Sequence, residues 1–127
     1  MTITAIVADD DESNLELFSE LLEVHDIKVL SKATNGKEAT VAFEKLRPDV
    51  VFLDVMMPEF DGLYALEEIR KIVPTSIVMM ITADTSDETA NKLEKLQPTA
   101  VIHKPYEIST ILQFLNSQLE LQEISKN

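Results

Sequence analysis

Five polar residues stand at the ends of short apolar runs: Asp9, Asp10, Asp54, Thr82 and Lys104. Carboxylate oxygens are ligands that Mg²⁺ prefers, and this ion takes one or two of them while keeping several waters. An ammonium group and a hydroxyl group can both donate hydrogen bonds to phosphoryl oxygens. Gathered in one place, these five side chains would bind a hard cation and a phosphoryl group.

The apolar runs before these residues predict the strands that position them. The runs cover residues 3–8, 50–53, 77–81 and 99–103. Parallel strands present their carboxyl ends at one edge of a sheet, and open α/β sheets bind ligands at that edge. The runs are apolar at most positions, which is typical of a sheet covered by helices on both faces. We therefore expect the five polar side chains to lie along one sheet edge.

Helical patterns alternate with these runs, and the alternation indicates a parallel α/β sheet. Capping boxes predict helix starts within residues 13–16 and 85–88. A turn at residues 35–36 precedes another helix, and the last helix is predicted from about Glu107. A further helix is predicted over residues 63–73, before Pro74. Together with the four runs and one more strand, these five helices make five βα units.

One further strand is predicted at the edge of the sheet. It runs from Ile27 to Leu30, and Lys28 and Lys32 give it a charged character. Charged side chains of this kind protect an edge strand from pairing with other chains.

Length and composition indicate one globular domain. The chain has 127 residues, of which 45% are hydrophobic and 27% are charged. We expect residues 1–127 to form a single domain without a linker. The chain contains no cysteine, which excludes disulfides and thiolate chemistry and fits a reducing compartment.

The strong negative charge excludes several kinds of partner. The net charge is −12, with 23 acidic against 11 basic residues. This balance argues against direct binding of nucleic acid and of anionic membrane surfaces. The apolar runs are far shorter than the roughly 18 residues of a membrane span, and the N-terminus lacks the features of a signal peptide. We therefore expect a cytoplasmic protein.

The residue types also suggest a reaction. A carboxylate such as Asp54 can act as a nucleophile and form an acyl phosphate. Phosphoryl transfer depends on in-line positioning and on neutralising negative charge. Mg²⁺, Lys104 and Thr82 around the phosphoryl oxygens would provide that neutralisation.

These same residues carry a family resemblance. The Asp9-Asp10 pair, the segment 54–62 (Asp-Val-Met-Met-Pro-Glu-Phe-Asp-Gly), Thr82-Ala83 and Lys104-Pro105 resemble the motifs of two-component response regulator receiver domains. The resemblance covers nearly the whole chain, and the order and spacing of all five positions agree with it. It implies a flavodoxin-like (βα)₅ fold with a five-stranded parallel sheet of order 2-1-3-4-5.

The resemblance also implies roles for individual residues. Asp54 would accept phosphate from a histidine kinase or a histidine phosphotransfer protein, assisted by Thr82 and Lys104. Asp10 and Asp54 would bind Mg²⁺ directly with the main-chain carbonyl of Met56, while Asp9 would act mainly through water. A cis peptide bond is expected at Lys104-Pro105. Such a domain is a signalling switch that catalyses only its own phosphorylation and dephosphorylation.

The sequence departs from the family pattern at the usual aromatic switch position, where it has Val101. Residues 98–100 (Pro-Thr-Ala) replace the common Gly-Ala that opens this strand. The readout through a threonine and an aromatic residue therefore cannot operate in its usual form. Met56 and Asp84 occupy positions that tune phosphate lifetime, and their net effect does not follow from the sequence.

The downstream partner is an unidentified protein, and the chain is either a stand-alone regulator or one domain of a longer protein. Phe114, Leu121 and Ile124 lie off the main apolar stripe of the last helix. They are either ordinary exposed residues or part of a weak dimer surface, so we expect a monomer or a weak dimer through that helix.

Three other functions share parts of this pattern. A phosphohydrolase of the haloacid-dehalogenase type would need a second Asp where Met56 stands. A flavodoxin would need a Ser/Thr/Gly-rich phosphate loop after the first strand, where residues 9–12 are all acidic. A receiver that is never phosphorylated is the third, and the presence of all five site residues disfavours it.

Overall fold

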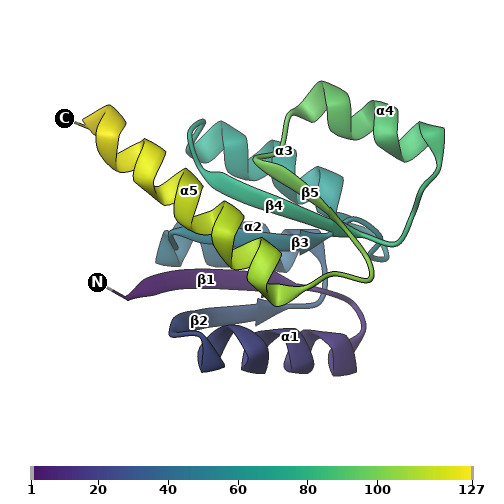
Figure 1. Ribbon diagram of the computed structural model, residues 1–127. Helices are drawn as coiled ribbons and strands as arrows, with labels where there is room; N and C mark the ends of the chain where they lie inside the picture. The colour runs from purple at the N-terminus through teal and green to yellow at the C-terminus, as the bar shows by residue number, and fades with distance from the viewer. Residues whose placement is uncertain (1, 127) are drawn as a thin grey trace.

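The computed structural model describes residues 2–126, with side chains up to residue 123. In this part of the chain five strands alternate with five helices (Figure 1). The strands are β1 (Ile3–Ala8), β2 (Ile27–Ala33), β3 (Val50–Asp54), β4 (Ile77–Thr82) and β5 (Ala100–His103). The helices are α1 (Glu12–Val24), α2 (Gly36–Leu46), α3 (Gly62–Ile72), α4 (Asp87–Leu96) and α5 (Ile108–Lys126).

The strands form one parallel sheet of order β2-β1-β3-β4-β5. This confirms the predicted flavodoxin-like α/β fold and its strand order. The register pairs Ala8 with Leu53 and Asp54 with Ile81, so neighbouring strands end at nearly the same level. The residues that follow the strand ends therefore share one edge of the sheet.

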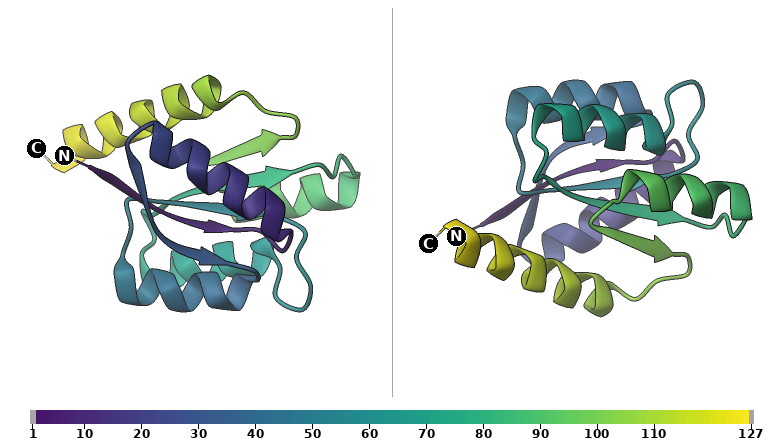
Figure 2. Two further views of the ribbon diagram at one scale, coloured as in Figure 1. Left: turned by 90° about the horizontal axis from the view of Figure 1, so that it is seen from below. Right: turned by 90° about the horizontal axis from the view of Figure 1, so that it is seen from above.

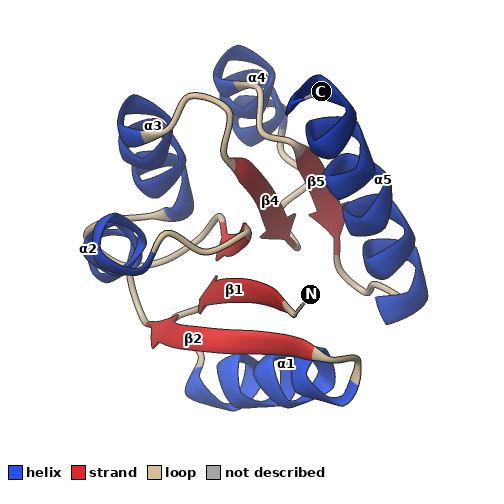
Figure 3. Ribbon diagram, turned by 90° about the vertical axis from the view of Figure 1, so that its left-hand side faces the viewer, coloured by secondary structure: helices blue, strands red, loops and turns tan. Residues whose placement is uncertain are grey.

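Helices cover both faces of the sheet (Figures 2 and 3). On the α1/α5 face, Phe18 and Leu22 of α1 and Leu115 of α5 belong to one buried apolar cluster. On the α2/α3/α4 face, Phe43 of α2 and Ile69 of α3 belong to a second cluster. The sheet thus separates two cores, and this explains why its strands are apolar on both sides.

Strand β3 shows how this pattern arises. Successive side chains of a strand point to opposite faces. Val50 and Phe52 accordingly lie in the α1/α5 core, whereas Val51 and Leu53 lie in the α2/α3/α4 core. All four side chains are fully buried. The run therefore has no polar alternation, and Asp54 at its end is the first polar residue.

The edge position predicted for β2 is confirmed, but the strand is longer than the predicted 27–30 and ends at Ala33. The pairing with β1 shifts register between Ala5 and Ile6 and then continues through the polar Ser31 and Lys32. Lys32 also pairs with Glu16 of α1 at 3.0 Å. Main-chain pairing with β1 and the buried Ala33 at its end hold the second half of this strand.

Two helix starts differ from the capping-box predictions. The N-cap of α1 is Asp11, whose carboxylate accepts the main-chain N–H of Asn14 at 3.1 Å. The box predicted at residues 13–16 is therefore wrong, because the aspartate before it caps the helix first. In α4 the N-cap is Ser86 rather than Thr85, and its hydroxyl accepts the N–H of Thr89. Asn35 caps α2, as the predicted turn suggested.

The last helix, α5, begins at Ile108, one residue after the predicted start. The helical spacing of Ile108, Ile111, Leu112, Leu115 and Leu119 predicts the apolar stripe of this helix. Ile111 and Leu115 are fully buried, while Phe114 and Leu121 are exposed. The side chain of Ile124 lies outside the described residues. Across the described residues, no helix combines the length and apolar content needed to cross a membrane.

Candidate phosphoryl-transfer site

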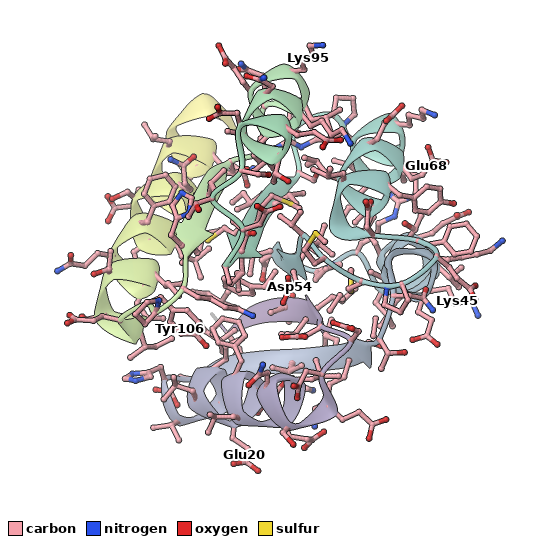
Figure 4. All side chains as sticks on the ribbon, turned by 90° about the vertical axis from the view of Figure 1, so that its right-hand side faces the viewer. Glu20, Lys45, Asp54, Glu68, Lys95 and Tyr106 are labelled. Atoms are coloured by element: carbon pink, nitrogen blue, oxygen red, sulfur yellow. The ribbon has the colours of Figure 1, made fainter. Side chains whose placement is uncertain are left out.

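Three strand ends place the charged residues of the candidate site. Asp9 follows β1, Asp54 ends β3 and Lys104 follows β5. Alternation along β1 and β3 places Asp9 and Asp54 on the same side of the sheet as Val7 and Phe52, which belong to the α1/α5 core. In the view onto this edge, Asp54 lies near the centre and Tyr106 beside it (Figure 4).

Lys104 joins the two carboxylates. Its Nζ lies 2.9 Å from Oδ2 of Asp54 and 3.8 Å from Oδ2 of Asp9. The bond to Asp54 links positions 50 residues apart in the chain. Both aspartates are buried, with 9% of Asp9 and 8% of Asp54 exposed. The peptide bond between Lys104 and Pro105 is cis, as the resemblance implied.

Main-chain amides occupy the remaining carboxylate oxygens. Oδ1 of Asp54 accepts the N–H of Met56 at 3.2 Å, and Oδ1 of Asp9 accepts the N–H of Asp11 at 2.9 Å. Each aspartate is therefore held by the loop that follows it. This fixes the orientation of both carboxylates toward the shared lysine.

The charges in this group are not fully balanced. Burial raises the pKa of Asp9, the Asp11 amide opposes this, and the negative charges of Asp54 and Asp10 raise that pKa further. Lys104 lowers the pKa of Asp9, but not enough to reverse the shift. Burial alone would lower the pKa of Lys104, yet its hydrogen bond to Asp54 and the charges of Asp54 and Asp9 give a net increase. The site thus has an excess of negative charge that a cation would relieve.

The residues expected to bind metal do not all converge. Within the described residues, no three carboxylate, imidazole or thiolate side chains are arranged to hold a metal ion. Asp10 is exposed and acts on Asp9 through its charge. The side chain of Met56 is 61% exposed and ends in a soft thioether that Mg²⁺ does not take, so this residue can contribute only its main-chain carbonyl. Carboxylates, a carbonyl and water still form an all-oxygen donor set that fits Mg²⁺, which needs only one or two carboxylates.

Thr82 is fully buried but does not join this group. Its Oγ1 accepts the main-chain N–H of Asp84 at 2.9 Å. Val78 and Met80, which precede it at the same parity along β4, lie in the α2/α3/α4 core. The Thr82 side chain therefore emerges on the face of the sheet opposite to Asp54.

The loop after Asp54 is held tightly to the sheet. Val55 donates its N–H to Ile81 at 2.9 Å, and Gly62 donates to the carbonyl of Val55 at 3.0 Å. A Cβ atom at residue 62 would overlap the main-chain oxygen of Asp54, so only glycine fits there. Asp61 caps α3 by accepting the N–H of Tyr64. The start of α3 is thus fixed against the end of β3.

A cavity of about 360 Å³ adjoins the carboxylates. Its lining includes Asp9, Asp54 and Lys104 together with Phe18 of α1 and Tyr106. The ring of Tyr106 packs edge-on against Phe18, with centroids 5.5 Å apart. Burial raises the pKa of Tyr106, although Lys104 lowers it. Sequence reasoning missed Tyr106 as a wall of the site, and its position directly after Lys104-Pro105 was the available signal.

Comparison with known proteins identifies the family. The chain matches the family model of the response regulator receiver domain over residues 5–116. A chemotaxis protein CheY of Thermotoga maritima is 29% identical over 111 residues, covering 87% of this chain and 92% of that protein. A protein-glutamate methylesterase/protein-glutamine glutaminase of Alkalilimnicola ehrlichii is 33% identical over 94% of this chain. The chain spans about a third of that relative's length.

Solved structures share the fold. A receiver domain protein from Clostridium thermocellum superposes with a TM-score of 0.88 at 26% identity, covering 96% of this chain and 98% of that one. A CheY-like receiver domain protein from Methanospirillum hungatei gives a TM-score of 0.90 at 23% identity, covering 98% and 99% of the two chains. Neither a flavodoxin nor a phosphohydrolase is needed to explain the fold or the motifs. The chain belongs to the response regulator receiver domain family of two-component signalling.

Proposed function

We propose that this chain is a phosphoacceptor switch in which Asp54 receives a phosphoryl group from a phosphohistidine donor. The observation that carries the proposal is the 2.9 Å contact between Lys104 Nζ and Asp54 Oδ2 at the carboxyl edge of the sheet. Both residues come from separate strands, and the adjoining cavity gives the carboxylate access to a donor. The whole chain, residues 1–127, would act as this one domain.

In the proposed transfer, a carboxylate oxygen of Asp54 attacks the phosphorus atom of the donor. A P–O bond forms as the P–N bond to the imidazole breaks, and the imidazole keeps the bonding electron pair. Lys104 moves its hydrogen bond from Oδ2 to a phosphoryl oxygen and so neutralises charge that spreads over the phosphoryl group. Thr82 would donate to another phosphoryl oxygen after leaving its contact with Asp84.

Receiver domains generally bind Mg²⁺ at the phosphorylation site. In this chain we propose Asp10, Asp54 and the main-chain carbonyl of Met56 as direct ligands, with Asp9 acting mainly through water. The raised pKa of Asp9, caused by its burial and by its acidic neighbours, supports a cation at this place. Bound Mg²⁺ would supply positive charge that offsets the repulsion between the carboxylates and the incoming phosphate.

The proposed partners are a histidine kinase or a histidine phosphotransfer protein upstream and a further protein downstream. The net charge of −12 speaks against direct contact with nucleic acid or anionic membranes and is compatible with a cytoplasmic location. Phe114 and Leu121 are exposed on α5, so we propose a monomer or a weak dimer through that helix.

Incubation with acetyl phosphate and Mg²⁺, followed by intact-mass measurement, tests the proposal. We expect the wild-type protein to gain the mass of one phosphoryl group and Asp54→Asn to gain none. Lys104→Met should slow the uptake strongly, because the buried carboxylate loses its only cationic neighbour among the described residues. Asp87→Asn is the matched control, since it removes an exposed carboxylate in the first turn of α4 and leaves the contacts of Lys104 with Asp9 and Asp54 intact. Equal uptake by Asp54→Asn and the wild-type protein would contradict the proposal.

A further inference from the structure

The loop between β3 and α3, residues 55–61, carries the main-chain carbonyl of Met56 that we propose as a Mg²⁺ ligand. The base of this loop is fixed, because Val55 donates its N–H to β4 and accepts the N–H of Gly62 at 3.0 Å. The tip of the loop, residues 58–60, lies beyond these two bonds. Its position must therefore be set by contacts with another element.

Helix α2 makes such a contact with its first residue. The main-chain N–H of Gly36 donates to the carbonyl of Phe60. Gly36 is buried and directly follows Asn35, the N-cap of α2. Among the described residues, no other main-chain or side-chain group from outside the loop forms a hydrogen bond with residues 57–60. The bond from Gly36 thus links the tip of the loop to the rest of the molecule.

The side chain of Phe60 is held by the same helix. The ammonium group of Lys37, the next residue of α2, lies 5.3 Å from the centroid of the Phe60 ring. That centroid is also 4.9 Å from the centroid of the Tyr64 ring. A cation–π contact at an exposed position is weak, so the main-chain bond is the main restraint. We call the contacts of Gly36 and Lys37 with Phe60 the α2 clasp.

The clasp requires glycine because the two backbones lie very close together. A Cβ atom at residue 36 would be 2.2 Å from the main-chain oxygen of Asp61 and 2.9 Å from that of Phe60. Both oxygens belong to the backbone and cannot swing aside as a long side chain can. Gly36 does not adopt a positive φ, so close approach and not an unusual conformation explains this residue. A larger side chain at this position must push the loop away from α2.

The Met56 carbonyl depends on the loop for its direction. Met56 lies between the fixed Val55 and the tip, and its N–H donates to Asp54 Oδ1 at 3.2 Å. No donor in the described part of the chain bonds to its carbonyl oxygen. The oxygen is therefore available as a ligand, and only the path of the backbone toward the tip sets where it points.

The clasp does not involve Asp54 itself. Asp54 belongs to β3, pairs with Ile81 of β4 and binds Lys104 through its carboxylate. None of these contacts includes α2. A displaced tip would therefore move the Met56 carbonyl relative to a carboxylate that stays in place.

We propose that the α2 clasp positions the Met56 carbonyl for Mg²⁺, which makes Gly36 and Phe60 positioning residues of the metal site. This inference rests on the proposed function and adds to it a helix that contributes no ligand. Contacts that orient the ligands of a metal commonly change its affinity by about 10–100-fold when they are removed.

A Mg²⁺ titration followed by amide NMR shifts tests the proposal on the unphosphorylated protein. We expect Gly36→Ala to bind Mg²⁺ about tenfold more weakly than the wild-type protein, because the added methyl group displaces the loop. Phe60→Ala keeps the main-chain bond but loses both ring contacts, so its affinity should fall about threefold.

Ala42→Gly is the matched control for these variants. It weakens α2 in its interior and leaves Gly36, Lys37 and Phe60 unchanged. Urea denaturation without Mg²⁺ should show a loss of stability in Ala42→Gly, while its Mg²⁺ affinity should equal that of the wild-type protein. A matching loss of Mg²⁺ affinity in Ala42→Gly would overturn the inference, because general weakening of α2 would then explain the effect.

Phosphoryl uptake from acetyl phosphate over a range of Mg²⁺ concentrations separates an effect on the metal from an effect on Asp54. In Gly36→Ala the half-saturating Mg²⁺ concentration should rise about tenfold, while the uptake rate at saturating Mg²⁺ should stay within about twofold of the wild-type rate. A lower saturated rate with an unchanged half-saturating concentration would overturn the inference, since the clasp would then act on Asp54.

The same measurements distinguish this inference from the proposed function. Wild-type protein that neither binds Mg²⁺ nor takes up phosphate would remove both. Wild-type protein that does both, with unchanged Mg²⁺ affinity in Gly36→Ala and Phe60→Ala, would overturn the inference alone. If Gly36→Ala does not fold, Phe60→Ala decides the question, because Phe60 is only half-buried and lies in a loop.

Discussion

Helices α3 and α4 lie on the same face of the sheet but are held there by different forces. Ala65, Leu66 and Ile69 of α3 are fully buried, and Gly62 fits closely against the end of β3. In α4, Leu93 is the one large apolar side chain among the buried residues, and polar groups hold both helix ends.

This difference decides which helix can move. Burying a leucine or isoleucine side chain contributes about 1.5–3 kcal/mol, whereas a hydrogen bond contributes about 0.5–1.5 kcal/mol net. A buried apolar contact also cannot be exchanged for one with water at low cost, but a hydrogen bond can. We infer that α3 belongs to the fixed frame of the site and that α4 is the element a small local change can shift.

The largest expected effect comes from truncating one buried leucine to alanine in each of the two helices. Leu66→Ala should lower the free energy of unfolding by about 4 kcal/mol, and Leu93→Ala by about 2 kcal/mol, because the less enclosed site relaxes more easily. Urea denaturation of both variants checks this. Equal losses would show that α4 is packed as firmly as α3 and would contradict the inferred difference between the two helices.

The second prediction concerns the C-terminal end of α4, where Arg70 of α3 donates to the carbonyls of Ser76 and Gln97 and to Thr99 Oγ1. Arg70→Ala should destabilise the protein by about 2 kcal/mol, because these three acceptors lose a charged donor. Arg70→Lys keeps the charge but not the planar fork, so it should recover only part of the loss. Hydrogen exchange should increase at the C-terminal end of α4 in both variants. An increase confined to the N-terminal turn would contradict the conclusion that Arg70 holds the C-terminal end of α4.

A third prediction extends the comparison to α1 on the opposite face. Ser19 is buried, and its hydroxyl has no hydrogen-bond partner among the described residues, unlike the hydroxyl groups of Thr89 and Thr99. Ser19→Ala should therefore stabilise the protein by about 1 kcal/mol, since it removes an unsatisfied polar group and favours the helix. Ser13→Ala, at an exposed position of the same helix, is the control and should change little. A loss of stability in Ser19→Ala would mean that the hydroxyl is bonded after all.

The smallest effect is local and depends on pH. The hydrogen bond from Thr89, followed by that from Ser86, lowers the pKa of Asp84 from its ordinary 3.8. A lowered carboxyl pKa stabilises the fold above the ordinary value, and the contribution is lost as the pH falls through the lowered pKa. The protection factors of amides in the first turn of α4, which correct for the intrinsic pH dependence of exchange, should therefore fall below pH 3.8, and less so in Thr89→Val. A carboxyl titration by NMR at or above 3.8 for Asp84 would contradict this.

Much of the site could be predicted from the sequence because it depends on strand ends. Apolar runs that stop at Asp54 and before Lys104 locate two strand ends, and a parallel sheet brings such ends to one edge. The pairing of Asp54 with Lys104 follows from that topology. The parallel α/β class could be predicted from the alternation of runs and helices, whereas the strand order followed from the family resemblance.

Other features depend on contacts that leave no pattern in the chain. The N-cap of α1 is Asp11 rather than the predicted Ser13, because several polar residues in a row before this helix can serve as caps. The orientation of Thr82 depends on the parity of β4 and on the Asp84 amide. The role of Arg70 depends on the Gln97 carbonyl, which lies 27 residues away along the chain. Such side-chain to main-chain contacts are fixed only when the elements have packed.

The most direct test of the account is to locate the phosphorylated residue chemically. Protein treated with acetyl phosphate and Mg²⁺ is reduced with borohydride, which converts an acyl phosphate of aspartate into homoserine, and the peptides are then mapped by mass spectrometry. We expect homoserine at position 54, with Asp9 and Asp10 unchanged. Homoserine at either of those two positions, or at none, would contradict it.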